Sequence, residues 1–361
     1  MPPQKNQHYV PKFYLKNFST DGINLNLYVI NKKEHVTGSL NNQCSKSYFY
    51  SNDTMLEKLI SQLESREASA INKLIRERKL SALSEEEYFV KILEFISMMN
   101  GRTLNNKKQT EKMIDNFMED IIKPMFRADP LSKGISDEDI AKMKMKWPTL
   151  HLLGIQIGVR AGILLSDLIP VLLVNNTKSE FIISDNPVVF YNRAFHKMKG
   201  VSMSGYTAPG LMIFCPLNPN LMLMLFHAPY YKIKMSKHHK VSMREKDVRE
   251  INKLQLYNGY NSVIYRTKKQ KEKIDQLHNE TGDIPNKPFT EANTEFWKGY
   301  GGEVKEIYHT TNGKIPFELN LKFIKAKPLG KGSVGFVRNK ELYEAFEALS
   351  PELMSIKNGN K

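Results

Sequence analysis

The sequence predicts an α+β protein in which long helices precede short strands. Two observations lead to this fold class. Apolar residues recur at helical spacing through much of residues 52–166, whereas residues 167–266 consist of short apolar or β-branched runs between turn residues. The regular alternation of strand and helix that a parallel α/β fold requires is missing from the sequence. We therefore expect an N-terminal region of long helices packed on a mainly antiparallel sheet, with a C-terminal extension.

The first elements are a strand and a long helix. Residues 24–30 are rich in apolar residues and follow a turn, so they predict a strand, and residues 31–50 predict a loop or a short strand. A helix is expected over residues 52–78, with Asn52 or Asp53 as its N-cap. Its apolar stripe consists of Leu56, Leu59, Ile60, Leu63, Ile71, Leu74 and Ile75.

Three more helices complete the helical region. Ser84 and Glu87 have the spacing of a capping box, which predicts a second long helix over residues 84–122. Ser136 precedes three acidic residues and is expected to cap a third helix. Residues 151–165 are apolar enough to form a buried fourth helix.

The second half of the chain is expected to supply the sheet. The strands predicted there are residues 169–174, 180–183, 188–191, 211–215 and 221–226. A helix is expected within residues 236–256, a long charged loop over 267–295, a strand near 317–324 and a helix near 340–349.

We expect two stretches of chain that form one packed unit. Residues 1–266 are interpreted as one domain, with a helical part over about 52–166 and a strand-rich part over about 167–266. Residues 267–361 are expected to pack on the same unit. Cys44 and Cys215 are too few for a disulfide framework or a cysteine-rich zinc site. The apolar runs are too short to span a bilayer, and no secretory signal is recognised, so we expect a cytoplasmic protein without membrane contact.

The charge favours a polyanionic partner. The chain has a net charge of +15 and a pI near 9.4, and an excess of this size favours association with nucleic acid. Basic residues are concentrated in residues 232–249 and 321–340. These stretches could follow a phosphate backbone, or they could be ordinary solvated faces.

Several motifs resemble one bacterial family. The opening Gln7-His8-Tyr9-Val10-Pro11 and the motif Ser184-Asp185-Asn186-Pro187 resemble the signatures of DUF4238, a family defined without an assigned activity. The resemblance spans roughly residues 5–266. Weaker matches accompany it, namely Tyr14-Leu15, Phe18, Tyr48-Phe49-Tyr50, Leu56-Glu57, Leu63-Glu64, Arg102, Pro216-Leu217, Asn252, Tyr257 and Tyr265. Members are similar to accessory-genome and defence-type proteins, which implies a nucleic-acid-directed effector.

His8 is the first candidate for chemistry. It lies among aromatic residues that can anchor the N-terminal segment, and its side chain titrates near neutral pH. We interpret His8 as a general acid or base acting on a ribose 2′-hydroxyl or a leaving oxygen. The alternative is a structural histidine whose ring nitrogens bind backbone groups.

Four further residues complete the predicted site. Glu64 lies two helical turns from Glu57 and could orient His8, or both glutamates could belong to a solvated stripe. Asp185 at a strand end could orient His8 or bind a divalent ion, or it could stabilise its own turn. Arg102, beside a kink expected at Gly101, could clamp a phosphate or pair with Glu57 or Glu64. Lys46 is expected to stabilise phosphate charge.

The leading hypothesis is a nuclease that cleaves RNA-like phosphodiesters, as a toxin or in phage defence. Mg²⁺ or Mn²⁺ could assist, but a metal-independent transesterification is equally compatible with this residue set. The partners expected are nucleic acid, RNA above all, and a protein from the same operon. The alternatives are a non-catalytic sensor or binding module, and an enzyme acting on a small phosphorylated molecule, which would have a deep narrow pocket.

Overall fold

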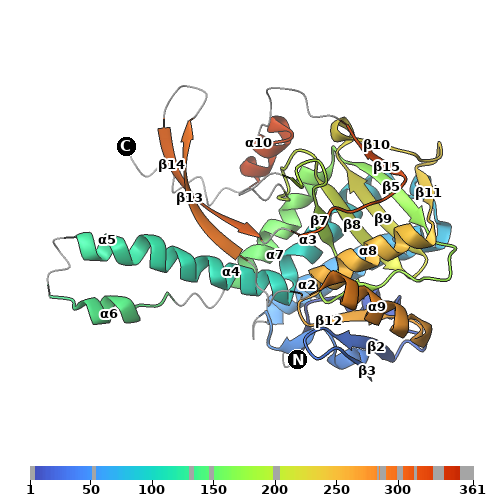
Figure 1. Cartoon of the computed structure of the whole chain (residues 1–361), viewed down its shortest axis with the longest axis horizontal. Coiled ribbons are helices and arrows are strands. Elements are labelled where there is room, and N and C mark those ends of the chain that lie inside the picture. The colour runs from blue at the N-terminus through green and yellow to red at the C-terminus, as the bar shows by residue number, and fades with distance from the viewer. Residues whose placement is uncertain are drawn as a thin grey trace.

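The computed structural model confirms the α+β class (Figure 1). A five-stranded sheet and a four-stranded sheet lie beside a group of helices from the first half of the chain. The structure describes residues 5–50, 54–129, 134–145, 150–197, 204–282, 284, 290–298, 304–312, 315–327 and 337–349. Across these residues, no helix has both the length and the apolar character that crossing a membrane requires.

The five-stranded sheet is the centre of the molecule. Its strand order is β11 (Lys240–Ser242), β5 (Ile169–Val174), β9 (Leu221–Phe226), β8 (Met212–Asn218) and β7 (Val189–Tyr191). All of these pairs are antiparallel except β11 with β5. The bounds predicted for β5 and β9 are confirmed to the residue. Both strands are continuous apolar runs because the sheet is covered on both faces.

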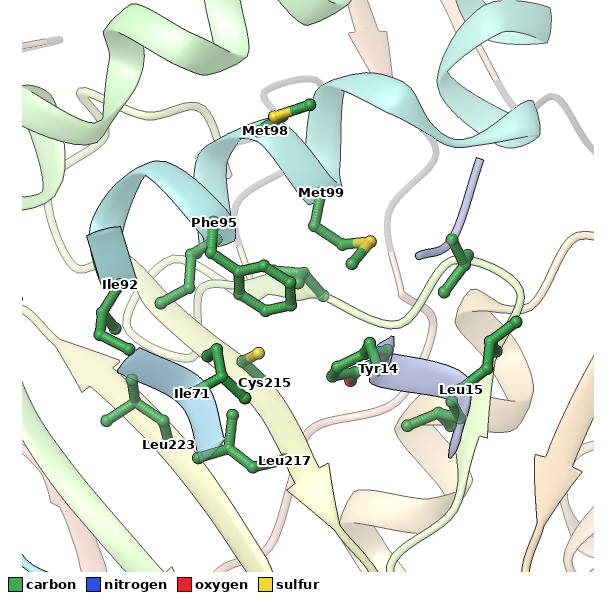
Figure 2. Packing of buried hydrophobic residues seen from close by; sticks show 14 of the residues in the cluster. Tyr14, Leu15, Ile71, Ile92, Phe95, Met98, Met99, Cys215, Leu217 and Leu223 are labelled. Carbon is green, nitrogen blue, oxygen red and sulfur yellow. The ribbon is translucent and has the colours of Figure 1, made fainter. Parts of the chain in front are cut away.

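Alternate residues of these strands enter two separate cores. Leu172, Cys215 and Leu223 point to one face, where they pack with residues of α2 (Thr54–Glu77) and α3 (Leu93–Arg102). Figure 2 shows this core, in which Phe95 of α3 and Ile71 of α2 approach Cys215. Their neighbours along the strands point to the other face and pack against α8 (Glu245–Asn258).

The N-terminal segment is anchored in the first core, as its aromatic residues predict. It consists of β1 (Asn6–His8) and the short helix α1 (Lys12–Lys16). The Tyr14 ring packs against Phe95 with centroids 5.5 Å apart, and its hydroxyl donates to the Pro216 carbonyl. β1 pairs with β4 (Ser45–Ser47), which places His8 opposite Ser45.

The four-stranded sheet lies below the first sheet in Figure 1. Its order is β3 (Glu34–Ser39), β2 (Asn24–Val29), β12 (Ser262–Tyr265) and β6 (Ile183–Ser184). α8 and α9 (Lys271–Thr281) cover it through Leu256, Ile274 and Leu277. The prediction of a loop over residues 267–295 was wrong, because α9 lies within these residues. Its three buried residues, Ile274, Leu277 and His278, are spaced by a single helical turn within a charged sequence, so the apolar signal is weak.

The second predicted helix is divided into several elements. The Ser84–Glu87 capping box is confirmed, because each side chain accepts the other residue's backbone N–H at 2.9 and 3.2 Å. A π-helical turn (Glu87–Ile92) then leads into α3, and the helix is interrupted at Thr103, which caps α4 (Leu104–Phe117) through the Asn106 N–H.

The helix also continues beyond its predicted end. A second π-helical turn (Met118–Ile122) precedes α5 (Lys123–Ala128), so the helix passes Pro124 instead of ending before it. A π turn widens the helix locally and gives room to a ring that lacks an N–H. α6 (Asp137–Lys142) begins at the predicted Ser136 cap, and α7 (Leu150–Ala161) is the expected fourth helix. In Figure 1, α4 and α5 form an arm that extends away from the sheets.

The remaining elements refine the other predictions. The helix expected within 236–256 begins only at Glu245, because β11 occupies the preceding residues. The strand near 317–324 is reduced to β15 (Ile324–Ala326), which pairs with β10 (Tyr231–Ile233). The hairpin of β13 (Thr290–Lys298) and β14 (Val304–Asn312) was not predicted. α10 (Lys340–Ala348) confirms the last helix, and the N-cap expected at residues 52–53 lies outside the described residues.

Candidate functional site

An open cleft of about 140 Å³ lies where β1, α1, α2 and the end of α3 meet. The charged and titratable side chains that line it are those of His8, Lys12, Glu57, Glu64 and Arg102, together with the Tyr50 phenol. Three of the predicted site residues, His8, Glu64 and Arg102, are therefore brought together by the fold. They come from positions up to 94 residues apart in the chain.

The backbone of His8 is fixed from two sides. Its carbonyl oxygen accepts one hydrogen bond from Nη2 of Arg102 at 2.8 Å and one from the Tyr50 hydroxyl at 2.7 Å. The preceding residue is also held, because the Gln7 side-chain oxygen accepts the Tyr50 backbone N–H at 2.8 Å. An N-terminal segment that would otherwise fray is thus held at the cleft.

The His8 ring is buried, and this burial favours its neutral form. Only 8% of the residue is exposed, and burial lowers the pKa of the imidazole below its ordinary value of 6.5. Nε2 lies 3.4 Å from the Leu40 carbonyl oxygen. Since a carbonyl only accepts, Nε2 carries the hydrogen in this contact, and Nδ1 is left as the basic nitrogen. One ring nitrogen of His8 therefore contacts a backbone group, as the alternative of a structural histidine predicts.

Arg102 is a buried hub that joins three segments. Its guanidinium is 1% exposed and donates to the Tyr50 hydroxyl at 2.8 Å, to the His8 carbonyl and to Glu64 Oε1 at 2.6 Å. The carboxylate of Glu64 is 25% exposed and borders the cleft. The pairing of Arg102 with Glu64, left open by the sequence, is what the structure contains. Arg102 positions the site and has few donors left for a phosphate.

Tyr50 links Arg102 to His8. Burial raises the pKa of its phenol to about 12, so the hydroxyl keeps its proton at neutral pH. It can then accept from Arg102 and donate to the His8 carbonyl at the same time. The Arg102 guanidinium carbon also lies 5.5 Å from the centre of the Tyr50 ring.

Two buried acids lie behind the cleft and were missed in the sequence. Glu67 is 1% exposed, and Glu94 of α3 is 8% exposed and pairs with Arg66. Burial raises the pKa of Glu67 to about 8, although the Arg102 charge opposes this shift. The burial of Glu67 could have been predicted from the sequence. Glu67 lies three residues after Glu64 and four before Ile71, and so falls on the apolar stripe of its helix.

Asp185 does not line the cleft. Its two carboxylate oxygens accept the backbone N–H groups of Tyr260 and Asn261 at 2.7 and 2.9 Å. It is 2% exposed and fixes the turn between α8 and β12. Asp185 is therefore a structural residue, but these bonds stabilise a turn 75 residues further along the chain and not its own turn, which was the predicted alternative.

Lys46 is also outside the cleft. It lies on β4 opposite Gln7, and its side chain is exposed to solvent. The basic side chain that borders the cleft is instead Lys12, in the first turn of α1. Lys12 follows the Gln7–Pro11 motif directly, and this position was the signal that sequence reasoning overlooked.

Within the described part of the chain, no three His, Cys, Asp or Glu side chains gather in a way that could hold a metal ion. Glu57 and Glu64 are two helical turns apart, about 10 Å along the axis, so their two carboxylates are too far apart to bind the same metal ion.

These features define a class of protein: an α+β fold in which an N-terminal histidine is fixed over a small cleft. Residues 6–269 match the model of a family described as a protein of unknown function, DUF4238, and the chain belongs to this family. No curated protein matches the chain, and no solved structure does.

Proposed function

We propose that this protein cleaves phosphodiester bonds in RNA, with His8 as the group that transfers the proton. The observation that carries the proposal is that a neutral imidazole and the Lys12 ammonium border one open cleft whose backbone is fixed by Arg102 and Tyr50. Rigid placement of a base near a cation is what an in-line displacement at phosphorus requires.

The proposed reaction is a transesterification. Nδ1 of His8 removes the proton from a ribose 2′-hydroxyl, and the resulting oxygen attacks the adjacent phosphorus. The bond from phosphorus to the 5′ oxygen breaks and a 2′,3′-cyclic phosphate forms. The departing 5′ oxygen, on the opposite side of phosphorus, takes a proton from water, and His8 releases its proton to solvent. Lys12 stabilises the negative charge that develops on the phosphoryl oxygens.

The size of the cleft favours a chain substrate over an enclosed small molecule. A volume of about 140 Å³ is below the roughly 300 Å³ at which small-molecule pockets begin, but it admits one phosphate group. The rest of the substrate would lie on the surface around the cleft. A net charge of +15 favours such binding.

The test compares wild type with His8→Asn on total RNA, tRNA, single-stranded DNA and duplex DNA. Each reaction is run with Mg²⁺ or Mn²⁺ and with EDTA, and products are resolved on a denaturing gel. His196→Asn is the matched control, because His196 is partly exposed and does not line the cleft. We expect RNA cleavage by wild type and His196→Asn only, with products that end in a cyclic phosphate. The EDTA lanes separate the metal-independent reaction from a metal-assisted one.

The pH profile provides a second readout. Because burial lowers the pKa of His8, the acidic limb of the rate profile should have its midpoint below 6.5, with a plateau above it. Absence of cleavage of every nucleic acid by folded wild type would reject the proposal. We extend the proposal to a role as an effector, either as a toxin or in phage defence. Such a role requires that expression of wild type arrests growth and that expression of the His8→Asn variant does not.

The second candidate is a non-catalytic binding module. Two observations favour it. The Arg102 guanidinium already donates to Tyr50, His8 and Glu64, and the Asp185 carboxylate already accepts from two backbone N–H groups. In that case His8→Asn would weaken binding of a partner without any change in nucleic-acid integrity. Co-purification of a partner with wild type but not with folded His8→Asn distinguishes this candidate.

A further inference from the structure

A second concavity lies at the other end of α2. It has a volume of about 520 Å³ and is formed mainly by two segments that are distant in sequence, with Pro170 of β5 as a further lining residue. One is the chain that leaves α2, Lys79 to Ser81, and the other is the turn before β11, Lys237 to Lys240. From Glu64 to Glu77, the last residue of α2, the helix axis advances about 20 Å, so this pocket is separate from the His8 cleft.

The turn that forms one wall is tightly fixed. The Ser236 hydroxyl oxygen accepts the backbone N–H groups of His238 and Lys240 at 3.3 and 3.2 Å. His239 has a φ of 53°, a left-handed conformation that is uncommon for a residue with a side chain. Its backbone carbonyl accepts from Leu172 at 2.8 Å, which ties the turn to the edge of the central sheet.

The His239 ring is held as well. Its Nδ1 donates to the Pro170 carbonyl oxygen at 3.0 Å, so the ring is oriented by the neighbouring strand β5. A strained backbone conformation and a fixed ring orientation cost free energy, and they persist only where the surrounding contacts compensate for that cost. The wall is thus pre-formed before any ligand arrives.

The charge of the pocket is entirely positive. Lys79, Lys237 and Lys240 line it with His238 and His239, and none of its lining residues is an acid. In the described part of the structure these three lysines form no ion pair. One acid close to them is Glu77, whose carboxyl pKa is lowered chiefly by its hydrogen bond to Arg76 at 2.8 Å and to a smaller extent by the charge of Lys79. Gathering three ammonium groups around a pocket that no acid lines is unfavourable, and a bound anion would relieve the repulsion.

The size and the remaining lining select the kind of anion. A volume of about 520 Å³ is within the range of small-molecule sites. Leu80 and Pro170 add apolar surface beside the lysines. Ammonium groups bind phosphate as point charges, and three of them suit a ligand with more than one phosphate.

We propose that this pocket binds a small ligand that carries two or more linked phosphate groups, such as a nucleoside triphosphate or inorganic polyphosphate. The lysines bind the phosphates, and Leu80 with Pro170 provides the surface for any organic part. The proposal is independent of phosphodiester cleavage at His8. It also assigns a role to part of the basic stretch 232–249 that the cleft leaves unused.

The test measures binding of tripolyphosphate, ATP, AMP and inorganic phosphate by isothermal titration calorimetry, at an ionic strength of about 0.15 M to suppress weak surface binding. The variant is the double substitution Lys237→Gln and Lys240→Gln. The matched control is Lys232→Gln and Lys234→Gln, two exposed lysines of the same stretch that do not line the pocket. His8→Asn is included to separate this site from the cleft.

We expect tripolyphosphate and ATP to bind wild type, the control and His8→Asn alike, and the pocket variant about tenfold or more weakly. AMP and inorganic phosphate should bind far less tightly. Equal affinity for tripolyphosphate and ATP would mean that the phosphate chain alone is recognised. Tighter binding of ATP would mean that the apolar surface of Leu80 and Pro170 also contacts the ligand. An equal loss in both double variants, or binding of an RNA oligonucleotide at the pocket with neither small ligand bound, would overturn the proposal.

Discussion

At the scale of single residues, buried charge determines the geometry of the His8 cleft. The side chain of Arg102 is only 1% exposed, and it donates hydrogen bonds to Tyr50, His8 and Glu64. Replacing such a hub by lysine would not preserve it, because an ammonium cannot reach three acceptors in the fixed planar geometry of a guanidinium. The same network places Glu67 close to a positive charge without giving its Oε1 a hydrogen-bond partner in the described part of the chain.

Glu67→Gln should change how the stability depends on pH. With a pKa raised from about 4.5 to about 8, Glu67 stays protonated in the folded protein across a range where the unfolded chain has lost the proton. The folded state then binds more protons, so its free energy of unfolding falls as the pH rises through this window. Glutamine keeps the shape and does not titrate. We expect the stability of Glu67→Gln relative to wild type to increase from about pH 5 to about pH 8.

The measurement is urea unfolding followed by circular dichroism at several pH values in that window. Glu77→Gln, an exposed position of the same helix, is the matched control and should follow wild type. Parallel stability curves for wild type and Glu67→Gln would mean that Glu67 is already ionised in the folded protein.

The sequence was informative about the site where the signal was local. His8 could be found because it stands in an aromatic segment, and Glu64 because its helix was recognisable. Asp185 could not be assigned, because its two donors, Tyr260 and Asn261, lie 75 and 76 residues further along the chain. Nothing in Ser184-Asp185-Asn186 reveals that a distant backbone turn will occupy the carboxylate.

At the scale of elements, α7 packs unusually closely on α3. Glycines recur every fourth residue, at Gly154 and Gly158 on one face of α7 and at Gly162 directly after its last residue. A Cβ at Gly158 would lie 2.9 Å from the Cα of Met98 and from the Ser97 carbonyl oxygen. The close approach also lets the Ser97 hydroxyl donate to the Gly158 carbonyl at 2.6 Å.

Gly158→Ala should therefore destabilise the protein, although alanine is the better helix former. The intrinsic preference favours alanine by about 1 kcal/mol, but the methyl group meets backbone atoms that cannot move aside like a side chain. We expect a net loss of about 1–3 kcal/mol in the free energy of unfolding, measured by urea denaturation. Gly205→Ala is the control, because a Cβ there has no atom within 4 Å. A stabilised Gly158→Ala would show that the two helices can separate at little cost.

Elements with a strong local sequence signal were predicted best. β5 and β9 were recognised because an apolar run between turns has few other interpretations, and the Ser84 and Ser136 caps because their hydrogen bonds are local. α9 and the hairpin of β13 and β14 were missed, because their sequences are dominated by charged and polar residues. The pairing of β1 with β4, on which the cleft depends, is non-local and leaves no periodic signal.

At the scale of the whole molecule, the chain beyond the family match contributes to the central core. Leu319, Leu321 and Phe323 are buried in the same cluster as Val171 and Leu173 of the central sheet. The contact is also polar, since the Leu319 N–H donates to the Tyr191 hydroxyl at 2.8 Å. Residues 6–269 match the family model, so the boundary of the family does not coincide with the boundary of the core.

A chain ending at residue 282 is therefore expected to lose cooperative folding. It retains the matched family region and α9, but it uncovers the face of the central sheet that Leu319, Leu321 and Phe323 cover. Burial of each such side chain is worth about 1.5–3 kcal/mol, so their combined loss approaches the roughly 5–15 kcal/mol by which whole domains are stable. A chain ending at residue 349 keeps every described residue and is the control. We expect the shorter chain to bind a hydrophobic dye and to lack a sharp thermal transition, whereas a soluble fragment that melts like the control would place the whole folding unit within residues 1–282.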